Sequence, residues 1–330
     1  MLRILGAAQV YPAYKPQRSV GGTIRIWGHG GRDRSPAGAL VQAWVQGFQR
    51  FHPQVSFEVT LRGQSTAIGG LYTGAADVAL MERPPSAIEL DGYRPIFGHD
   101  PFGVTVATGS LANVGHALAP VVFVHQRNPL SRLTLAQLDA LIGADARRGH
   151  PLIKVWGELG ADGQLRDQPV QVLTYELASE LPQYIQNAVM GGSQKWRGAL
   201  REFCAPTDTR SQETRSCSRQ LMQTLSETPN ALAVATWPER GAQAKAVALS
   251  ATADGPFMPP TRESIAQRRY PLIRDLQVYV DRVPGKPVAQ PVGEFLSYLL
   301  SAPGQMCIAK DGGYFALPAQ EAARVRETLA

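Results

Sequence analysis

The sequence predicts an α/β fold, arranged as two domains or as one large domain. Strand-like and helix-like patterns alternate along the 330 residues, which is typical of a sheet with parallel neighbouring strands. Hydrophobic residues make up 44% of the chain and charged residues 18%, so there is enough apolar material for a packed core. Glycine and proline, with 32 and 25 residues, indicate many short elements joined by turns and argue against coiled coils and helix bundles.

The N-terminal third shows the alternation most clearly. Strands are expected over residues 22–27 and 55–61, where apolar and polar residues alternate, and over residues 76–81, which form a mostly apolar run. Between the first two, Ser35 supplies an N-cap oxygen and Pro36 a suitable first helical residue. The helix that follows has an apolar stripe made of Leu40, Val41, Trp44, Val45, Phe48 and Phe51.

The remaining elements follow the same pattern. A short helix is expected to end near Tyr72. Further strands are expected over residues 102–107, 120–125, 170–174, 231–235 and 275–280. Helices are expected to begin at Thr134, near Ser179 and near Arg219, and to cover 292–300 and 304–310. The polar stretch of residues 191–218 is expected to be an insertion or a mobile loop.

The charge distribution argues against a nucleic-acid partner. The chain has 33 Lys and Arg against 27 Asp and Glu, a net charge of +6. Most basic residues are isolated arginines, and only Arg147–Arg148 and Arg268–Arg269 are adjacent pairs, so no basic run indicates nucleic-acid binding. No apolar run reaches the roughly 18 residues of a membrane-spanning helix.

The N-terminus and the cysteines give weak indications of the compartment. Residues 1–9 pair one basic residue with a short apolar stretch, which resembles the end of a secretory signal but is shorter than a full one. Either the signal has been trimmed or the resemblance is chance. Cys204 and Cys217 flank a polar stretch that a disulfide could close in an oxidising compartment, and Cys307 would then remain unpaired.

Motifs for cofactors, metals and catalysis are weak. The glycines after the first strand fit a dinucleotide-binding pattern only until Asp33 takes the place of the third glycine. The six histidines occur singly and the cysteine spacing fits no zinc site, so no metal or cofactor is expected. Ser65 lies where a nucleophilic serine would, but G-x-S-x-G lacks its second glycine, and a helix N-cap explains Ser65 better than a serine hydrolase does.

One local feature, a hydroxyl residue at a strand-to-helix turn, occurs three times. A hydroxyl residue lies at the turn before a helix at Ser35, at Ser65 with Thr66, and at Ser179. Such turns expose backbone N–H groups at the positive end of a helix dipole, where anions bind. These turns either converge on one anion at the carboxyl ends of the strands or are three unrelated caps.

At these residues the sequence resembles the phosphate-binding periplasmic proteins of ABC importers, which have the type 2 periplasmic-binding-protein fold. The likeness runs from about Gly22 to Pro318 and is most specific over residues 63–84, which are similar to the family's G-S-S-T-x-I…G-x-A-D-I-G-x-x-S-R-P segment. Residues 128–138, 155–160 and 313–318 also match in kind and order.

The resemblance implies two α/β lobes joined by two crossover strands, with the ligand held between them. Lobe 1 is expected to contain residues 22–118 and 250–330, lobe 2 residues 119–249, and residues 1–21 an extended N-terminal segment. By the same resemblance, the ligand-contacting positions are Ser35, Gln64, Ser65 and Glu82, with others on a lobe 2 helix.

The sequence departs from the family on that lobe 2 helix. In the R-x-x-x-S-G-T motif, Tyr175 replaces the arginine, Ser179 keeps the serine, and Glu180 and Leu181 replace the glycine and threonine. A phenol cannot reproduce the two-point, charge-assisted grip of a guanidinium on phosphate. The loop residues Arg32 and Arg34 are candidates to restore positive charge.

We therefore expect an extracytoplasmic, monomeric solute-binding protein that captures a small oxyanion, phosphate first, without catalysis. The family implies the membrane subunits of an ABC importer as partners. The alternatives are an accessory interaction protein that kept the fold but lost phosphate binding and, third, a hydrolase that uses Ser65.

Overall fold

The chain divides into two compact units. The computed structural model describes residues 11–30, 36–113, 116–198, 200–204 and 212–330. Unit 1 contains residues up to 110, residues 115–117 and residues 274–330; unit 2 contains residues 111–114 and 118–273. The chain thus leaves unit 1 near residue 111 and returns to it at Arg274.

Residues 250–273, which the sequence assigned to lobe 1, belong to unit 2. Strand β11 (Ala248–Ser250) pairs in parallel with β6 (Arg132–Thr134), and Leu249 bridges to Met258. The Tyr270 hydroxyl donates a hydrogen bond to the Pro120 carbonyl at 3.1 Å. These contacts attach the segment to unit 2, so the return to unit 1 comes later than the resemblance implies.

The sheet of unit 1 has five strands in the order β2-β1-β3-β12-β4. Their bounds are Gly22–Gly28 (β1), Val55–Thr60 (β2), Val78–Met81 (β3), Phe102–Thr108 (β4) and Asp275–Val280 (β12). Strand β1 is parallel to both β2 and β3, while β12 is antiparallel to β3 and β4. All five strands predicted for this part of the chain are confirmed.

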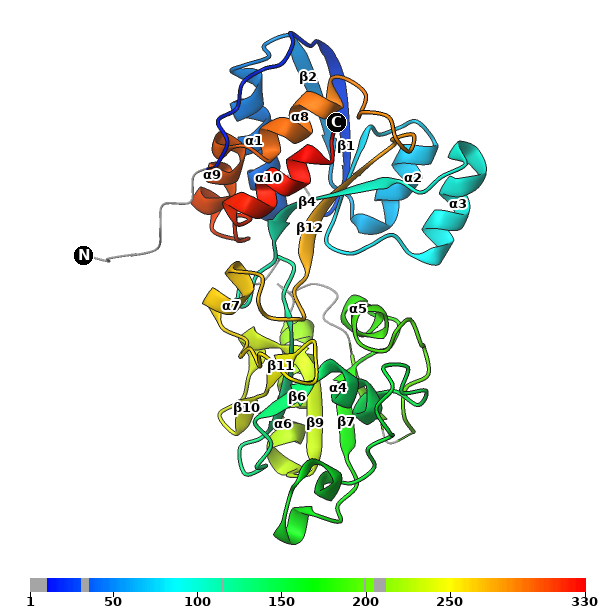
Figure 1. Ribbon diagram of the computed structural model, residues 1–330, viewed down its shortest axis with the longest axis vertical. Helices are drawn as coiled ribbons and strands as arrows, with labels where there is room; N and C mark the ends of the chain where they lie inside the picture. Colours follow the sequence, from blue (N-terminus) through cyan, green and yellow to red (C-terminus); the bar gives the residue numbers. More distant parts are fainter. Residues whose placement is uncertain (1–10, 31–35, 114–115, 199, 205–211) are drawn as a thin grey trace, which may run out of the picture. The chain divides into compact units, whose positions relative to one another are not determined.

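Helices cover both faces of this sheet (Figure 1). One face carries α1 (Pro36–Gln49), α8 (Val292–Leu299), α9 (Ala302–Asp311) and α10 (Ala319–Glu327). The other carries α2 (Ala67–Tyr72), preceded by the 3-10 turn η1 (Gln64–Thr66), and α3 (Ala87–Phe97). The sequence analysis missed α3 and α10, although Ser86 and Glu89 form a capping box at the start of α3.

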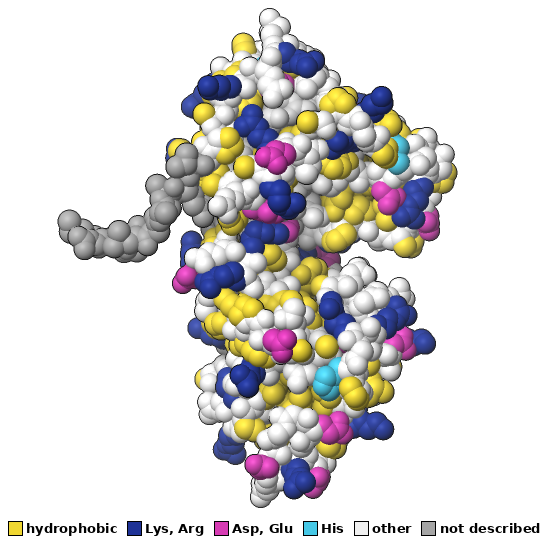
Figure 2. Space-filling view, viewed as in Figure 1, with side chains coloured by type: hydrophobic (Ala, Val, Ile, Leu, Met, Phe, Trp, Pro, Cys, Tyr) yellow, Lys and Arg dark blue, Asp and Glu magenta, His cyan; other side chains and the backbone are white. Residues whose placement is uncertain are grey.

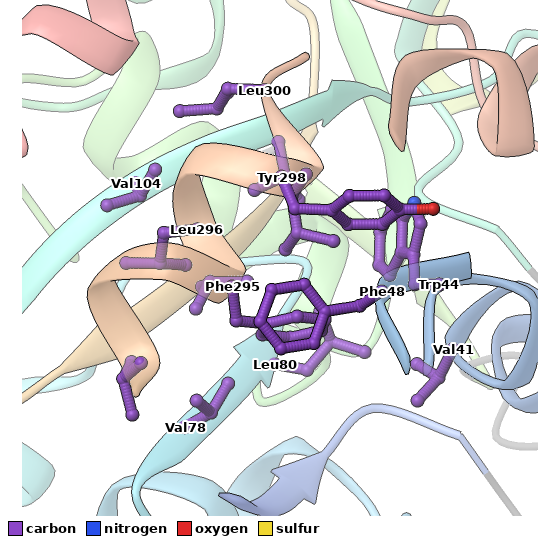
Figure 3. Packing of buried hydrophobic residues seen from close by; sticks show 14 of the residues in the cluster. Val41, Trp44, Phe48, Val78, Leu80, Val104, Phe295, Leu296, Tyr298 and Leu300 are labelled. Atoms are coloured by element: carbon purple, nitrogen blue, oxygen red, sulfur yellow. The ribbon is translucent and has the colours of Figure 1, made fainter. Parts of the chain in front are cut away.

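An aromatic cluster forms the centre of the larger core of unit 1 (Figure 3). The Phe48 ring meets the Phe295 ring edge-on at a centroid distance of 5.3 Å and the Tyr298 ring at 5.6 Å. Phe48 is fully buried, whereas Phe51, expected on the same stripe, is 43% exposed. Helix α1 ends at Gln49, before Phe51 could continue its apolar face.

The sheet of unit 2 also has five strands, in the order β10-β5-β9-β7-β8. Their bounds are Pro120–His125 (β5), Gln171–Tyr175 (β7), Leu200–Phe203 (β8), Ala231–Thr236 (β9) and Ala244–Ala246 (β10). Strand β7 is parallel to β8 and β9, and β5 is antiparallel to β9 and β10. The accompanying helices are α4 (Leu135–Ile142), α5 (Glu180–Ala188), α6 (Gln212–Glu227) and α7 (Arg262–Ala266), with 3-10 turns η2 (Trp156–Leu159), η3 (Gly163–Leu165) and η4 (Trp237–Glu239).

The prediction that residues 191–218 form only a loop was wrong. Strand β8 lies within this stretch and extends the sheet beside β7, and α6 begins at Gln212, earlier than expected. Cys204 and Cys217 are joined by a disulfide, which ties the residue after β8 to α6. Cys307 is a free thiol.

The charged side chains are dispersed over the surface, as the sequence indicates. Figure 2 shows Lys and Arg side chains scattered over the visible face of each unit, with Asp and Glu among them. Of the helices formed by the described residues, none has the length and apolarity to cross a membrane.

An ion pair joins the start of β3 to the middle of β1. Asp77 accepts hydrogen bonds from the Arg25 backbone N–H at 2.8 Å and from the Arg25 side chain at 3.0 and 2.7 Å. Burial raises the pKa of Asp77, but these bonds outweigh it and hold the pKa below its usual value. The pair therefore stabilises the fold above about pH 4 and loses this contribution as the pH falls.

The aromatic cluster gives a first prediction. Phe48→Ala should lower the free energy of unfolding by about 3–5 kcal/mol, because it leaves a cavity beside the rings of Phe295 and Tyr298. Denaturant unfolding, followed by the fluorescence of the buried Trp44, measures this loss. Ile88→Ala, at a side chain that is 84% exposed, is the control and should change stability by less than about 0.5 kcal/mol. Equal effects of the two variants would contradict the packing described.

The Arg25–Asp77 pair gives a second prediction. Asp77→Asn should cost about 0.2–1 kcal/mol at pH 7, since both side chains are partly exposed. The difference from wild type should shrink toward pH 3, where the carboxylate is protonated. Thermal unfolding across pH 3 to 7 measures it, with Asp91→Asn, at a 75% exposed carboxylate, as the control. A difference independent of pH would rule out the ionic contribution.

Candidate functional site

The carboxyl ends of β1, β2 and β3 bring together, at one edge of the sheet, the sequence-predicted residues of unit 1 that the structure describes, Gln64, Ser65 and Glu82. Because these strands are parallel, the segments that follow them, at His29, at residues 63–66 and at Glu82, emerge on the same side. Gly28 has a φ of 146°, and a Cβ there would meet the Leu80 carbonyl oxygen at 2.0 Å. Because Gly28 has no Cβ, its backbone can lie close to Leu80, and the N–H of His29 donates a hydrogen bond to the Leu80 carbonyl oxygen at 2.7 Å.

Two further segments reach this edge from the antiparallel strand β12 and from the C-terminal region. Arg274 directly precedes β12, which runs antiparallel to β3. Tyr314 is positioned by the neighbouring bridge between Thr108 and Phe315. We call the resulting group, consisting of His29, Gln64, Ser65, Glu82, Arg274 and Tyr314, the strand-end cluster.

Glu82 is the central residue of the strand-end cluster. It is 4% exposed, and its Oε1 accepts a hydrogen bond from the Tyr314 hydroxyl and lies 3.2 Å from His29 Nε2. Among the residues that the structure describes, none donates a hydrogen bond to the other carboxylate oxygen, Oε2. An acceptor oxygen that has no donor from the described residues, on a residue that is largely buried, favours a ligand that carries an O–H or N–H group.

Tyr314 stays a donor to Glu82 at neutral pH. Burial, followed by the charge of Glu82 and the hydrogen bond to it, raises the pKa of Tyr314 well above its ordinary value. Its ring meets the ring of His116 edge-on at 4.7 Å, and Gly313 leaves the space for that imidazole, since a Cβ there would lie 1.8 Å from His116 Nε2. Packing therefore holds the phenol in place beside the carboxylate.

Gln64 connects the turn after β2 to the end of β3. Its side chain is buried, and its Oε1 accepts a hydrogen bond from the Glu82 backbone N–H at 2.7 Å. Ligand contact by Gln64 stays a prediction from the sequence; what the structure shows is that Gln64 fixes the backbone of Glu82. A hydroxyl at this position is too short to make that connection in the same way.

Ser65 is the exposed member of the turn. Thr66 directs its hydroxyl to the Gly63 carbonyl at 2.9 Å, and neither residue caps η1 or α2 through its side chain. The expected N-cap is therefore met by position alone at Thr66, the N-cap residue of α2, whereas Ser65 is the N-cap of neither element. The Ser65 hydroxyl instead faces solvent beside the cluster, where it can donate to an anion.

Arg274 brings a positive charge to the cluster. It is 8% exposed, and its Nη2 lies 3.4 Å from the carbonyl oxygen of Glu82. Its own carbonyl accepts a hydrogen bond from the Gly109 N–H at 2.7 Å, which holds the start of β12 against the end of β4.

Unit 2 contains the other two predicted residues that the structure describes. Tyr175, at the end of β7, is 1% exposed, and its hydroxyl lies 3.0 Å from the Ser218 hydroxyl on α6. Ser179 is the N-cap residue of α5, but its hydroxyl donates to the Glu176 carbonyl at 2.7 Å and does not cap the helix. Their part in ligand binding remains a prediction.

Arg32, Arg34 and Ser35, the remaining predicted residues, lie outside the described part of the chain. Sequence reasoning missed His29, Arg274 and Tyr314. His29 appeared to be one isolated histidine among six, and Arg274 and Tyr314 are 192 and 232 residues away from Glu82 along the chain. Tyr314 could have been found through the matched segment 313–318 that contains it.

Two kinds of chemistry, metal binding and hydrolysis, can be checked for the described residues of the cluster. The described residues contain no group of three His, Cys, Asp or Glu side chains able to hold a metal ion. Within that same part of the chain, the histidine of the cluster faces Glu82 and has no hydrogen bond to Ser65, so the nucleophile and base of a hydrolase are not assembled. Hydroxyl and cationic donors beside an open carboxylate oxygen match a small anion that still carries a proton.

Comparison with known proteins agrees with the fold. Phosphate-binding protein PstS of Pseudomonas aeruginosa is 28% identical over 291 residues, which cover 88% of this chain and 83% of that protein.

Two solved structures are similar over most of their length. An ABC-type phosphate transport receptor from Vibrio cholerae gives a TM-score of 0.52 at 19% identity, over 88% of this chain and 99% of that one. PstS from Borrelia burgdorferi gives 0.55 at 14% identity, over 89% and 98%. These likenesses and the two five-stranded mixed sheets confirm the expected type 2 periplasmic-binding-protein fold. The PBP superfamily domain matches residues 33–303, most of the chain, and the chain therefore belongs to the PBP superfamily.

Proposed function

We propose that this chain is a non-catalytic binding protein that captures a small protonated oxyanion, phosphate first. The observation that carries the proposal is Glu82, a residue that is 4% exposed. Its carboxylate oxygen Oε2 has no donor among the described residues, and its backbone carbonyl lies 3.4 Å from the guanidinium of Arg274. An oxyanion with a proton supplies both the donor that Glu82 Oε2 lacks and the acceptors that Ser65 and Arg274 favour.

The relatives support phosphate over other anions of this kind. Over most of the chain, the similar proteins named above are phosphate-binding proteins or a phosphate transport receptor. At neutral pH phosphate retains a proton and sulfate does not, so the open acceptor of Glu82 favours phosphate as well. Arsenate, which has the same shape and protons, is expected to bind similarly.

An extracytoplasmic location and a transport partner belong to the same proposal. The disulfide between Cys204 and Cys217 is of the kind that forms in oxidising compartments. One relative is an ABC-type transport receptor, so the membrane subunits of an ABC importer are the partner that we propose. The protein itself would act as a monomer.

One observation favours a second candidate, an accessory interaction protein that kept the fold and lost phosphate binding. The family's arginine is replaced by Tyr175, whose hydroxyl meets Ser218 within unit 2. Without that guanidinium a phosphate loses a strong, charge-assisted contact. The two candidates differ in whether phosphate binds at all.

The proposed function predicts that phosphate stabilises the protein. At a phosphate concentration of about 100 times Kd, the free energy of unfolding should rise by about 2.7 kcal/mol, visible as a higher Tm. Sulfate at the same concentration should give a smaller shift. The absence of any shift with phosphate, arsenate, sulfate or carboxylates would refute binding and favour the accessory protein.

Ser65 tests the position of the site. Ser65→Ala should weaken phosphate binding by about 10-fold to 100-fold, because it removes a hydrogen bond to a charged ligand. Titration calorimetry gives Kd, with Ser19→Ala as the control, since Ser19 is exposed and precedes β1 at the opposite edge of the sheet. If both serine variants bind like wild type, the anion does not bind at the strand-end cluster.

Glu82 tests the need for a protonated ligand. Glu82→Gln keeps an acceptor for Tyr314, removes the negative charge and adds a donor. We expect the preference for phosphate over sulfate, measured as a ratio of Kd values, to fall by about tenfold, equivalent to about 1.4 kcal/mol. An unchanged ratio would mean that the carboxylate does not contact the ligand.

A further inference from the structure

The strand-end cluster raises an electrostatic problem for any anion. A ligand that donates a proton to Glu82 Oε2 brings its own negative charge next to a carboxylate that is 4% exposed. Repulsion between like charges is stronger inside a protein than in water, since little solvent screens it. Binding therefore requires a positive charge close to Glu82.

The residue that supplies this charge in the family does not supply it here. By its place in the sequence, the arginine position is occupied by Tyr175, a neutral phenol packed inside unit 2 and in contact with Ser218. The charge must therefore come from a different part of the chain; Arg32 and Arg34, the candidates that the sequence offers, lie outside the described residues.

The neighbouring arginine, Arg83, is already neutralised. Its two terminal nitrogens bind the two carboxylate oxygens of Glu89 at 2.7 and 2.8 Å, a two-point ion pair at the start of α3. Burial raises the pKa of Glu89, but the bonds from Arg83 and Ser86 outweigh it and lower the pKa, so Glu89 stays charged and keeps Arg83 engaged.

Arg274 has the position that is required. It immediately precedes β12, at the carboxyl end of the neighbouring antiparallel strand β3, and its Nη2 lies 3.4 Å from the Glu82 carbonyl. Its charge lowers the pKa of Tyr314, against the larger effect of burial. The charge of Arg274 therefore acts on the Tyr314 hydroxyl, which donates to Glu82, and little water lies between them to screen it.

We propose that Arg274 supplies the positive charge that holds the oxyanion beside Glu82, in place of the arginine that this chain lacks at Tyr175. The proposal rests on the proposed function of oxyanion binding. It assigns to this protein a specificity-determining residue at the start of β12, where the sequence motifs place none. It also explains how the cluster can combine a carboxylate with an anionic ligand.

Calorimetric titration of the full chain with inorganic phosphate tests this inference. Arg274→Gln should raise Kd at least tenfold, because it removes the charge. Arg274→Lys keeps the charge without the planar fork and should stay within about fivefold of wild type. Arg94→Gln, at an exposed arginine paired with Asp100 in the same unit, removes one positive charge elsewhere and should leave Kd unchanged.

The outcomes separate this inference from the proposed function. If wild type does not bind phosphate, the proposed function itself fails. If wild type binds and Arg274→Gln, folded by circular dichroism, binds equally well, only the role of Arg274 is refuted. Should Arg274→Gln fail to fold, Arg274→Lys decides: retained affinity supports a charge at this position, and complete loss of binding with an unchanged Tm of the unliganded protein contradicts it.

Discussion

Glu82 is a largely buried carboxylate at the carboxyl ends of β1, β2 and β3. The arrangement of the surrounding residues in unit 1 depends on the need to stabilise this charge. A charge in that position is unfavourable unless its oxygens find donors. The chain meets this requirement for one oxygen with Tyr314, from the C-terminal part of the sequence, and with His29 nearby. In the proposed function, the other oxygen accepts a hydrogen bond from the ligand, so one structural requirement would be the source of the specificity.

The same constraint explains several local features of the fold. Gln64 fixes the Glu82 backbone, so the turn after β2 and the end of β3 move together. Gly28 allows β1 to end directly against Leu80, and Gly313 leaves room for the imidazole that packs on Tyr314. Gln64 thus acts on the Glu82 backbone and Gly313 on the packing of Tyr314, while Gly28 acts on Leu80, two residues before Glu82. The surrounding sheet, supported on one face by the aromatic cluster at Phe48, provides the rigid frame.

The strands that the sequence predicted carry apolar patterns that depend only on their immediate neighbours, whereas the short strands β6, β8, β10 and β11 were not predicted. Helix α3 was missed because Gly92 and Pro95 interrupt its pattern, although its capping box was readable. Helix α10 was missed because its sequence, AQEAARVRE, has few large apolar side chains. The boundary at residue 273 could not be predicted, since it is decided by contacts such as that of Tyr270 with Pro120, 150 residues apart.

For the site, the sequence supplied the residues that lie in one continuous motif, Gln64, Ser65 and Glu82. It could not supply Arg274 or Tyr314, since their proximity to Glu82 is created only when β12 and the C-terminal segment join the sheet. The substitution at Tyr175 was visible in the sequence, but its contact with Ser218 was not. Pattern and resemblance thus identify the family, while the charge balance at the site emerges only from the folded chain.

The most direct measurement of the central claim is a crystal structure of the protein grown with phosphate. The account predicts a phosphate oxygen about 2.5–2.7 Å from Glu82 Oε2, the spacing of a hydrogen bond from a protonated oxygen to a carboxylate, with the Tyr314 hydroxyl still on Oε1. A phosphate bound elsewhere, or Glu82 turned away with both oxygens bonded to the protein, would contradict it.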